Sequence, residues 1–117
     1  MDVRCLIVDD DRGFLEAARS LLEREGLTIV GVASTSAAAL REAETLRPDV
    51  VLVDVSLGDE SGFELARRLR DATVILISAR SEADLADLLA VSDAAGFLSK
   101  SELCAEAVRG FVQRDSR

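Results

Sequence analysis

The sequence of 117 residues contains no histidine, tryptophan or tyrosine, and only two cysteines. Neither Cys5 nor Cys104 has a cysteine or histidine neighbour at zinc-ligand spacing, so no zinc site is expected. We expect both thiols to be buried and reduced. No apolar run reaches the ~18 residues that span a membrane, and no signal peptide is visible. These absences predict a cytoplasmic protein with no membrane partner.

Basic residues are also scarce, with 14 against 22 acidic residues and a net charge of −8. A nucleic-acid-binding surface would be basic and clustered, and no aromatic residue lies in a polar stretch where it could stack on bases. Hydrophobic residues make up 49% of the chain, which is enough for one core. We expect a single domain over residues 1–117, in which the polar segment 113–117 starts a tail or linker.

Four short apolar runs each end on, or just before, a polar side chain. They are Leu6–Val8 before Asp9 and Asp10, Val50–Val53 before Asp54, Val74–Ile77 before Ser78, and Gly96–Leu98 two residues before Lys100. Such runs are typical of strands buried on both faces of a parallel sheet. Ligand sites in open α/β sheets lie beyond the carboxyl ends of the strands, so these polar side chains should converge at one edge.

Helical patterns separate the apolar runs along the whole chain. The expected strands cover 6–8, 28–32, 50–53, 74–77 and 95–98. The first expected helix is capped by Asp11 and ends at Gly26, the second covers 35–46, and the third covers about 63–69. The fourth starts at Ser81, with Leu85, Leu88 and Leu89 facing inward. The fifth starts at Ser101, with Phe111 facing inward. This alternation predicts an α/β fold, a five-stranded parallel sheet with five helices on its two faces.

The predicted edge of the sheet carries the carboxylates of Asp9, Asp10 and Asp54. Two carboxylates about 4 Å apart repel each other by roughly 4 kcal/mol at an effective dielectric near 20, so the cluster requires cations. Lys100 supplies one charge, and Mg²⁺, which prefers carboxylates, water and phosphate oxygens, would supply two. Asp54 is then the candidate nucleophile for a phosphoryl group held by Mg²⁺, Lys100 and the Ser78 hydroxyl.

Each of these residues, taken alone, also has a purely structural explanation. The acidic cluster could cap a helix, Asp54 could be a turn residue, Lys100 a solvated charge and Phe97 a core residue. The prediction of a phosphoryl site therefore depends on four strand ends that carry complementary chemistry in the right order.

Taken together, these motifs resemble the receiver domain of bacterial two-component response regulators. The matching positions are Asp9, Asp10, Asp54, Ser78, Phe97 and Lys100, together with the segment from Asp54 to Gly62. The resemblance covers essentially the whole chain. It implies a flavodoxin-like, doubly wound sheet with the strand order 2-1-3-4-5.

The resemblance also implies a function, a metal and partners. Asp54 would accept a phosphoryl group from a sensor histidine kinase, and the phosphohistidine must come from that partner because this chain has no histidine. Asp10, Asp54 and the Ser56 carbonyl would bind Mg²⁺ directly, with Asp9 acting through water. Ser78 and Phe97 would move together and reshape the face of the fourth helix, fifth strand and fifth helix, which could form a homodimer. DNA would be contacted only through an output domain absent from this chain.

Three positions depart from the family pattern. Gly58 replaces the usual proline, which we expect to loosen the loop that carries the Ser56 carbonyl. Ser101 follows Lys100 where many members have proline, and a cis bond there would cost ~2.5–4 kcal/mol. The stretch from Asp54 to Ser78 is short, which predicts a short third helix or an abrupt loop.

Two other functions are also compatible with these residues. A pseudo-receiver would use the same fold only for binding, and the Gly58 and Ser101 departures keep this alternative alive. A haloacid-dehalogenase-type phosphatase would use acids near Asp9, but it would leave Asp54 without a role and needs a later acidic pair that the chain lacks.

Overall fold

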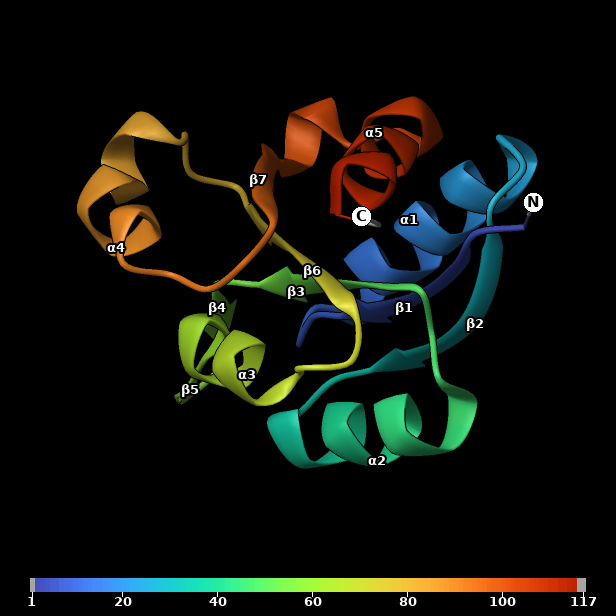
Figure 1. Cartoon of the computed structure of the whole chain (residues 1–117), viewed down its shortest axis with the longest axis horizontal. Coiled ribbons are helices and arrows are strands. Elements are labelled where there is room, and N and C mark those ends of the chain that lie inside the picture. The colour runs from blue at the N-terminus through green and yellow to red at the C-terminus, as the bar shows by residue number, and fades with distance from the viewer. Residues whose placement is uncertain (1, 116–117) are drawn as a thin grey trace.

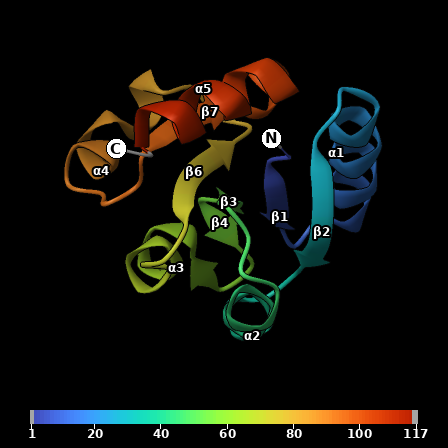
Figure 2. The ribbon, with the colours of Figure 1, turned by 45° about the vertical axis from the view of Figure 1, so that its right-hand side comes forward.

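The computed structural model of the protein describes residues 2–115. Five parallel strands form one sheet in the order β2-β1-β3-β6-β7, as Figures 1 and 2 show. The strands are β1 (Arg4–Val8), β2 (Thr28–Ala33), β3 (Val50–Asp54), β6 (Thr73–Ser78) and β7 (Gly96–Ser99). In chain order this is the predicted 2-1-3-4-5 sheet, so the α/β, flavodoxin-like fold class is confirmed.

Helices cover both faces of the sheet (Figure 1). They are α1 (Arg12–Arg24), α2 (Ser36–Leu46), α3 (Gly62–Arg68), α4 (Ala86–Ala90) and α5 (Ala105–Asp115). Short 3₁₀ turns, η1 (Ala83–Leu85) and η2 (Lys100–Glu102), precede α4 and α5, and two short strands, β4 (Ser56–Leu57) and β5 (Glu60–Ser61), precede α3. Within the described residues, no helix is long and apolar enough to cross a membrane.

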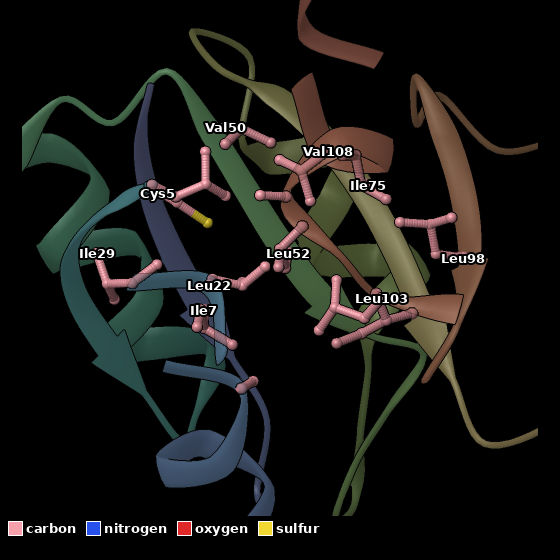
Figure 3. Close-up of a cluster of buried hydrophobic side chains, with 14 of the residues drawn as sticks. Cys5, Ile7, Leu22, Ile29, Val50, Leu52, Ile75, Leu98, Leu103 and Val108 are labelled. Carbon is pink, nitrogen blue, oxygen red and sulfur yellow. The ribbon is translucent and has the colours of Figure 1, made fainter. Parts of the chain in front are cut away.

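The apolar core is split into two clusters because successive strand residues point to opposite faces of the sheet. In β3, Val50 and Leu52 belong to one cluster, and Val51 and Val53 belong to the other. The first cluster, drawn in Figure 3, packs under α1 and α5, and the second packs under α2 and α3. Every residue of β3 is buried, as expected for a central strand of a parallel sheet.

The predicted ends of the first two helices are confirmed. The Asp11 side chain accepts hydrogen bonds from the backbone N–H groups of Gly13 and Phe14, and so caps α1. Gly26, which follows α1, has a φ of 99°, the left-handed conformation that suits glycine after a helix. At the end of α2, Arg47 has a φ of 50° immediately before Pro48, so the helix stops there.

The prediction for the fourth helix is partly wrong. Ser81 does accept a hydrogen bond from the Asp84 N–H, but the segment begins as the 3₁₀ turn η1, and α4 has only five residues. A 3₁₀ turn has three residues per turn, so it shifts the angular positions of the residues that follow. Leu85 is buried as predicted, whereas Leu88 is 52% exposed instead of facing the core.

Ser101 does not cap the last helix, contrary to the prediction. It lies inside η2, where its hydroxyl is 3.0 Å from that of Ser99, and α5 begins only at Ala105. Ser99 and Glu102 cap η2 instead, because the short turn after β7 brings their side chains together. The helix α5 includes the start of the segment predicted to be a tail, and Ser116 and Arg117 lie outside the described residues.

Candidate functional site

The polar residues that follow the strands meet at one edge of the sheet. The register pairs Val8 of β1 with Val53 of β3, which places Asp9 and Asp54 side by side at the carboxyl ends of the two central strands. Lys100 follows β7 at the outer edge of the sheet, and its Nζ lies 2.7 Å from Asp9 Oδ2 and 2.9 Å from Asp54 Oδ2. The structure therefore brings together three of the residues predicted to form a site.

Asp10 completes a group of three carboxylates. Asp9, Asp10 and Asp54 each offer one oxygen, and these oxygens lie within 4.8 Å of one another. Asp9 and Asp54 are buried, whereas Asp10 is exposed, so the cluster is open to solvent on one side. Hard oxygen ligands in a partly open cluster fit Mg²⁺, which keeps several of its own waters when it binds to proteins.

Asp9 is the most confined of the three acids, with no exposed surface. Its Oδ1 accepts a hydrogen bond of 2.8 Å from the Asp11 N–H, and its Oδ2 faces Lys100. Burial raises the pKa of Asp9 to about 6, although the hydrogen bonds from Lys100 and Asp11 act in the opposite direction. The site therefore holds a carboxylate whose charge is costly unless a cation is beside it.

The Asp54 carboxylate is held at both oxygens. Oδ1 accepts a hydrogen bond of 2.9 Å from the Ser56 N–H, and Oδ2 faces Lys100. Gly62 packs against the main chain of Asp54, because a Cβ at position 62 would lie 1.9 Å from the Asp54 main-chain carbonyl oxygen. Glycine is therefore required at 62 for α3 to start this close to the end of β3.

Lys100 contacts an aromatic ring as well as two acids. Burial disfavours its charged form, but the hydrogen bonds to Asp9 and Asp54 and their negative charges outweigh this and raise the pKa of Lys100 above 10.5. Its Nζ also lies 4.2 Å from the centre of the Phe14 ring, a cation–π geometry. Sequence reasoning assigned Phe14 only to the apolar face of the first helix, and no local signal links it to a lysine 86 residues later.

Ser78 and Phe97 lie on neighbouring strands near the same edge. Ser78 is the last residue of β6, is buried, and accepts a hydrogen bond of 3.0 Å from the Arg80 N–H. Phe97, in β7, pairs with Leu76 of β6, and its half-buried side chain packs against the second core cluster. Both occupy the strand positions that the sequence predicts.

The segment after Asp54 folds into a hairpin that was not predicted from the sequence. β4 and β5 form an antiparallel hairpin, in which Ser56 pairs with Ser61 and Leu57 pairs with Glu60. Gly58, the first residue of the two-residue turn, has a φ of 61°, which a type II′ hairpin turn requires and which proline cannot adopt. The glycine is therefore what allows the hairpin to close, and the expectation that it loosens this loop stays a prediction.

The two other departures from the family pattern also have structural outcomes. No peptide bond between described residues is cis, so Lys100 and Ser101 are joined by a trans bond. The helix α3 has seven residues and is followed by only four residues before β6, which confirms the prediction of a short third helix.

A model of the family described as response regulator receiver domain matches residues 5–108. The chain belongs to the response regulator receiver family. A putative transcriptional regulator of Pseudomonas aeruginosa is 36% identical over 107 residues, which are 88% of this chain and 52% of the relative. The response regulator GacA of Pseudomonas viridiflava is 34% identical over 112 residues, which are 92% of this chain and 52% of the relative. This receiver domain thus spans about half the length of these relatives.

A solved structure of a receiver domain has the same fold as this chain. The signal receiver domain of the putative response regulator NarL from Mycobacterium tuberculosis has a TM-score of 0.84 at 30% identity, covering 96% of this chain and 97% of that one. Receiver domains of response regulators act in two-component signalling, and receiver domains in general bind Mg²⁺ at an acidic cluster such as the one found here.

Proposed function

We propose that this receiver domain is a phosphorylation-controlled switch in which Asp54 accepts a phosphoryl group from the phosphohistidine of a partner sensor kinase. The observation that carries the proposal is the placement of Lys100 Nζ 2.9 Å from Asp54 Oδ2 and 2.7 Å from Asp9 Oδ2. A cation held between two acids at the open edge of the sheet can move to a phosphoryl oxygen once one of those acids is phosphorylated.

The transfer forms one bond and breaks another. A carboxylate oxygen of Asp54 attacks the phosphorus, an aspartyl phosphate forms, and the phosphorus–nitrogen bond breaks with its electron pair leaving on the kinase histidine. Lys100 and the Ser78 hydroxyl would hold two of the three phosphoryl oxygens. Asp10, Asp54 and the Ser56 carbonyl would hold Mg²⁺, with Asp9 acting through water; the ion would neutralise the acids and the incoming phosphoryl charge.

Phosphorylation would act on the face formed by α4, β7 and α5. Ser78 and Phe97 would shift together, and this shift would bias the face between two states. Leu88 and Val91 at α4 are 52% and 82% exposed, which suits contact with a second copy of the chain or with an output domain. DNA would be reached only through such an output domain. We place the protein in the cytoplasm, with residues 1–117 forming one receiver domain.

Intact-mass measurement with acetyl phosphate tests the phosphoryl site. We expect the wild-type protein to gain one labile phosphoryl group with Mg²⁺ and none in EDTA. Asp54→Asn should gain none, whereas Asp71→Asn, an exposed acid between α3 and β6, should behave as wild type. Equal phosphorylation of Asp54→Asn would reject the assignment.

A second variant tests the role of Lys100. We expect Lys100→Ala to bind Mg²⁺ but to lose the change at α4, β7 and α5 that follows phosphorylation, because the phosphoryl group then lacks the lysine ammonium that it would contact. Amide chemical shifts on these elements, recorded before and after phosphorylation, provide the measurement. An unchanged response would contradict the proposed role of Lys100.

The alternative function is that of a pseudo-receiver, which would bind partners without phosphorylation. Gly58 and Ser101, which replace two usual prolines beside the site, are the sequence features that leave this alternative open. It would be supported if the wild-type protein gained no acyl phosphate with Mg²⁺ and acetyl phosphate.

A further inference from the structure

The hairpin formed by β4 and β5 begins at Ser56, whose N–H donates a hydrogen bond to Asp54 Oδ1 in the acidic cluster and whose carbonyl is the proposed metal ligand. Gly58 in its turn lies over Asp10, since a Cβ at Gly58 would be 3.7 Å from Asp10 Oδ2. A hairpin of two residues per strand does not hold its shape in water without other contacts. The position of the Ser56 carbonyl therefore depends on what ties the hairpin to the rest of the molecule.

Besides the hydrogen bond from the Ser56 N–H to Asp54 Oδ1, three contacts tie the hairpin to different parts of the fold. Leu57 is 3% exposed and belongs to the second core cluster. The Ser61 hydroxyl accepts a hydrogen bond of 3.3 Å from the Glu64 N–H and caps α3. Glu60 Oε1 accepts a hydrogen bond of 2.9 Å from the Ser36 N–H, at the first residue of α2. Figure 1 shows α2 with its first turn toward β5.

The contact between Glu60 and α2 is favourable for two physical reasons. The first N–H groups of a helix have no partner within the helix, so Glu60 satisfies one of them. A carboxylate at this end also lies at the positive end of the helix dipole. The contact joins residues 24 positions apart and links the hairpin to the first residue of α2.

We propose that Glu60 is a positioning residue that holds the Ser56 carbonyl in place for the metal by fastening the β4–β5 hairpin to the first turn of α2. The inference rests on the proposed function, because it assigns Ser56 to the Mg²⁺ site. Glu60 itself does not touch the metal or the phosphoryl group. Its carboxylate acts through Ser36, and its loss frees the turn at Gly58 and Asp59 to move away from Asp10.

Mg²⁺ affinity, measured by isothermal titration calorimetry, tests this role. Glu60→Ala should weaken binding roughly two- to fivefold, the size of a charge interaction with a helix terminus. Glu60→Gln keeps an acceptor oxygen and should recover part of the affinity. The matched control is Asp59→Asn, which removes one charge from the same turn at a residue that has no hydrogen bond or ion pair among the described residues, and it should bind close to wild type.

A second variant removes the donor without changing any charge. Proline is favoured at the first position of a helix and has no N–H, so Ser36→Pro deletes the hydrogen bond and preserves α2. Thr35 has extended backbone angles, which a following proline accepts. We expect Ser36→Pro to weaken Mg²⁺ binding as Glu60→Ala does, the double variant to be no weaker than either single one, and Ser36→Ala to bind as wild type.

Amide hydrogen exchange in EDTA gives a readout that does not involve the metal. The backbone amides of the hairpin should exchange faster in Glu60→Ala and Ser36→Pro than in Asp59→Asn or Ser36→Ala. If the wild type binds no Mg²⁺, the proposed function fails. If the wild type binds Mg²⁺ and all variants bind equally well, or if the losses in Glu60→Ala and Ser36→Pro simply add, only the role of Glu60 is overturned.

Discussion

The buried carboxylate of Asp9 shows how a single residue can link stability to function. Its Oδ2 lies 2.7 Å from Lys100 Nζ and its side chain has no exposed surface, so its negative charge depends on nearby cations. The unfolded chain has no such constraint, and there an aspartate titrates near 3.8. Because the pKa of Asp9 differs between the folded and unfolded states, the free energy of unfolding depends on pH.

Asp9 predicts the direction of a pH effect on the metal-free protein. The folded state has the higher pKa, about 6, so between pH 3.8 and about 6 it binds more protons than the unfolded state. The contribution of Asp9 to stability is therefore present at low pH and lost as the pH rises through about 6. The loss relative to Asp9→Asn should be at most about 1.4 kcal/mol per pH unit.

Urea unfolding in EDTA, followed by circular dichroism at several pH values, measures this effect. The two proteins are compared by the slope of their free energy of unfolding against pH. The absolute free energies are not compared, because the substitution also removes the ion pair with Lys100. Parallel pH profiles for the two proteins would show that Asp9 titrates normally in the fold.

At the scale of the element, short segments decide the geometry of the site. β4 and β5 have two residues each, yet they carry Ser56 and bring Glu60 to α2. The turn between them depends on Gly58, whose φ of 61° disfavours any residue with a Cβ. Space is not the constraint here, since the nearest atom to a Cβ would be 3.7 Å away.

The same glycine-to-alanine change should therefore have opposite effects at two positions. Gly58→Ala should destabilise the protein by about 1 kcal/mol, because alanine strains the left-handed turn. Gly110→Ala, in the helix α5 with no atom within 4 Å of the new Cβ, should stabilise it by about 0.5–1 kcal/mol. Free energies of unfolding in urea provide the comparison. A stabilising Gly58→Ala would contradict the hairpin turn described here.

At the scale of the whole molecule, charge is the dominant feature. The chain carries a net charge of −8, and three carboxylates gather within 4.8 Å at one edge of the sheet. This concentration of negative charge opposes folding unless it is neutralised, and Lys100 supplies only one cation. A divalent ion bound only by the folded protein would shift the folding equilibrium further.

We therefore expect Mg²⁺ to stabilise the protein against heat. A ligand at 100 times its dissociation constant adds about 2.7 kcal/mol to the stability of the state that binds it. The Tm of the wild type should rise by several degrees with Mg²⁺, beyond the effect of NaCl at equal ionic strength. Asp10→Asn removes the exposed member of the proposed ligand set and should lose most of this rise. An equal rise in both proteins would indicate general screening of charge.

Predictions that depended on neighbouring residues in the sequence were more accurate than predictions that depended on how separate elements meet. The strands and the residues at their ends depend on local apolar runs, and Asp9, Asp54 and Lys100 were found from these alone. The inward position of Leu88 and the helix cap at Ser101 were wrong, because 3₁₀ turns changed the spacing that those predictions assumed. The assigned roles of Ser56, Ser78 and Phe97 remain predictions.

The pattern of apolar runs by itself determined the parallel sheet and the edge at which its acids and its lysine gather. A buried strand is a run of consecutive apolar residues, so the sequence shows where each strand lies and where it ends. Only the tertiary structure decided that Phe14 lies over Lys100 and that Glu60 binds the start of α2. These contacts join residues 86 and 24 positions apart, and their existence depends on how separate elements pack. No local pattern encodes that packing, because each partner alone looks like an ordinary surface or core residue.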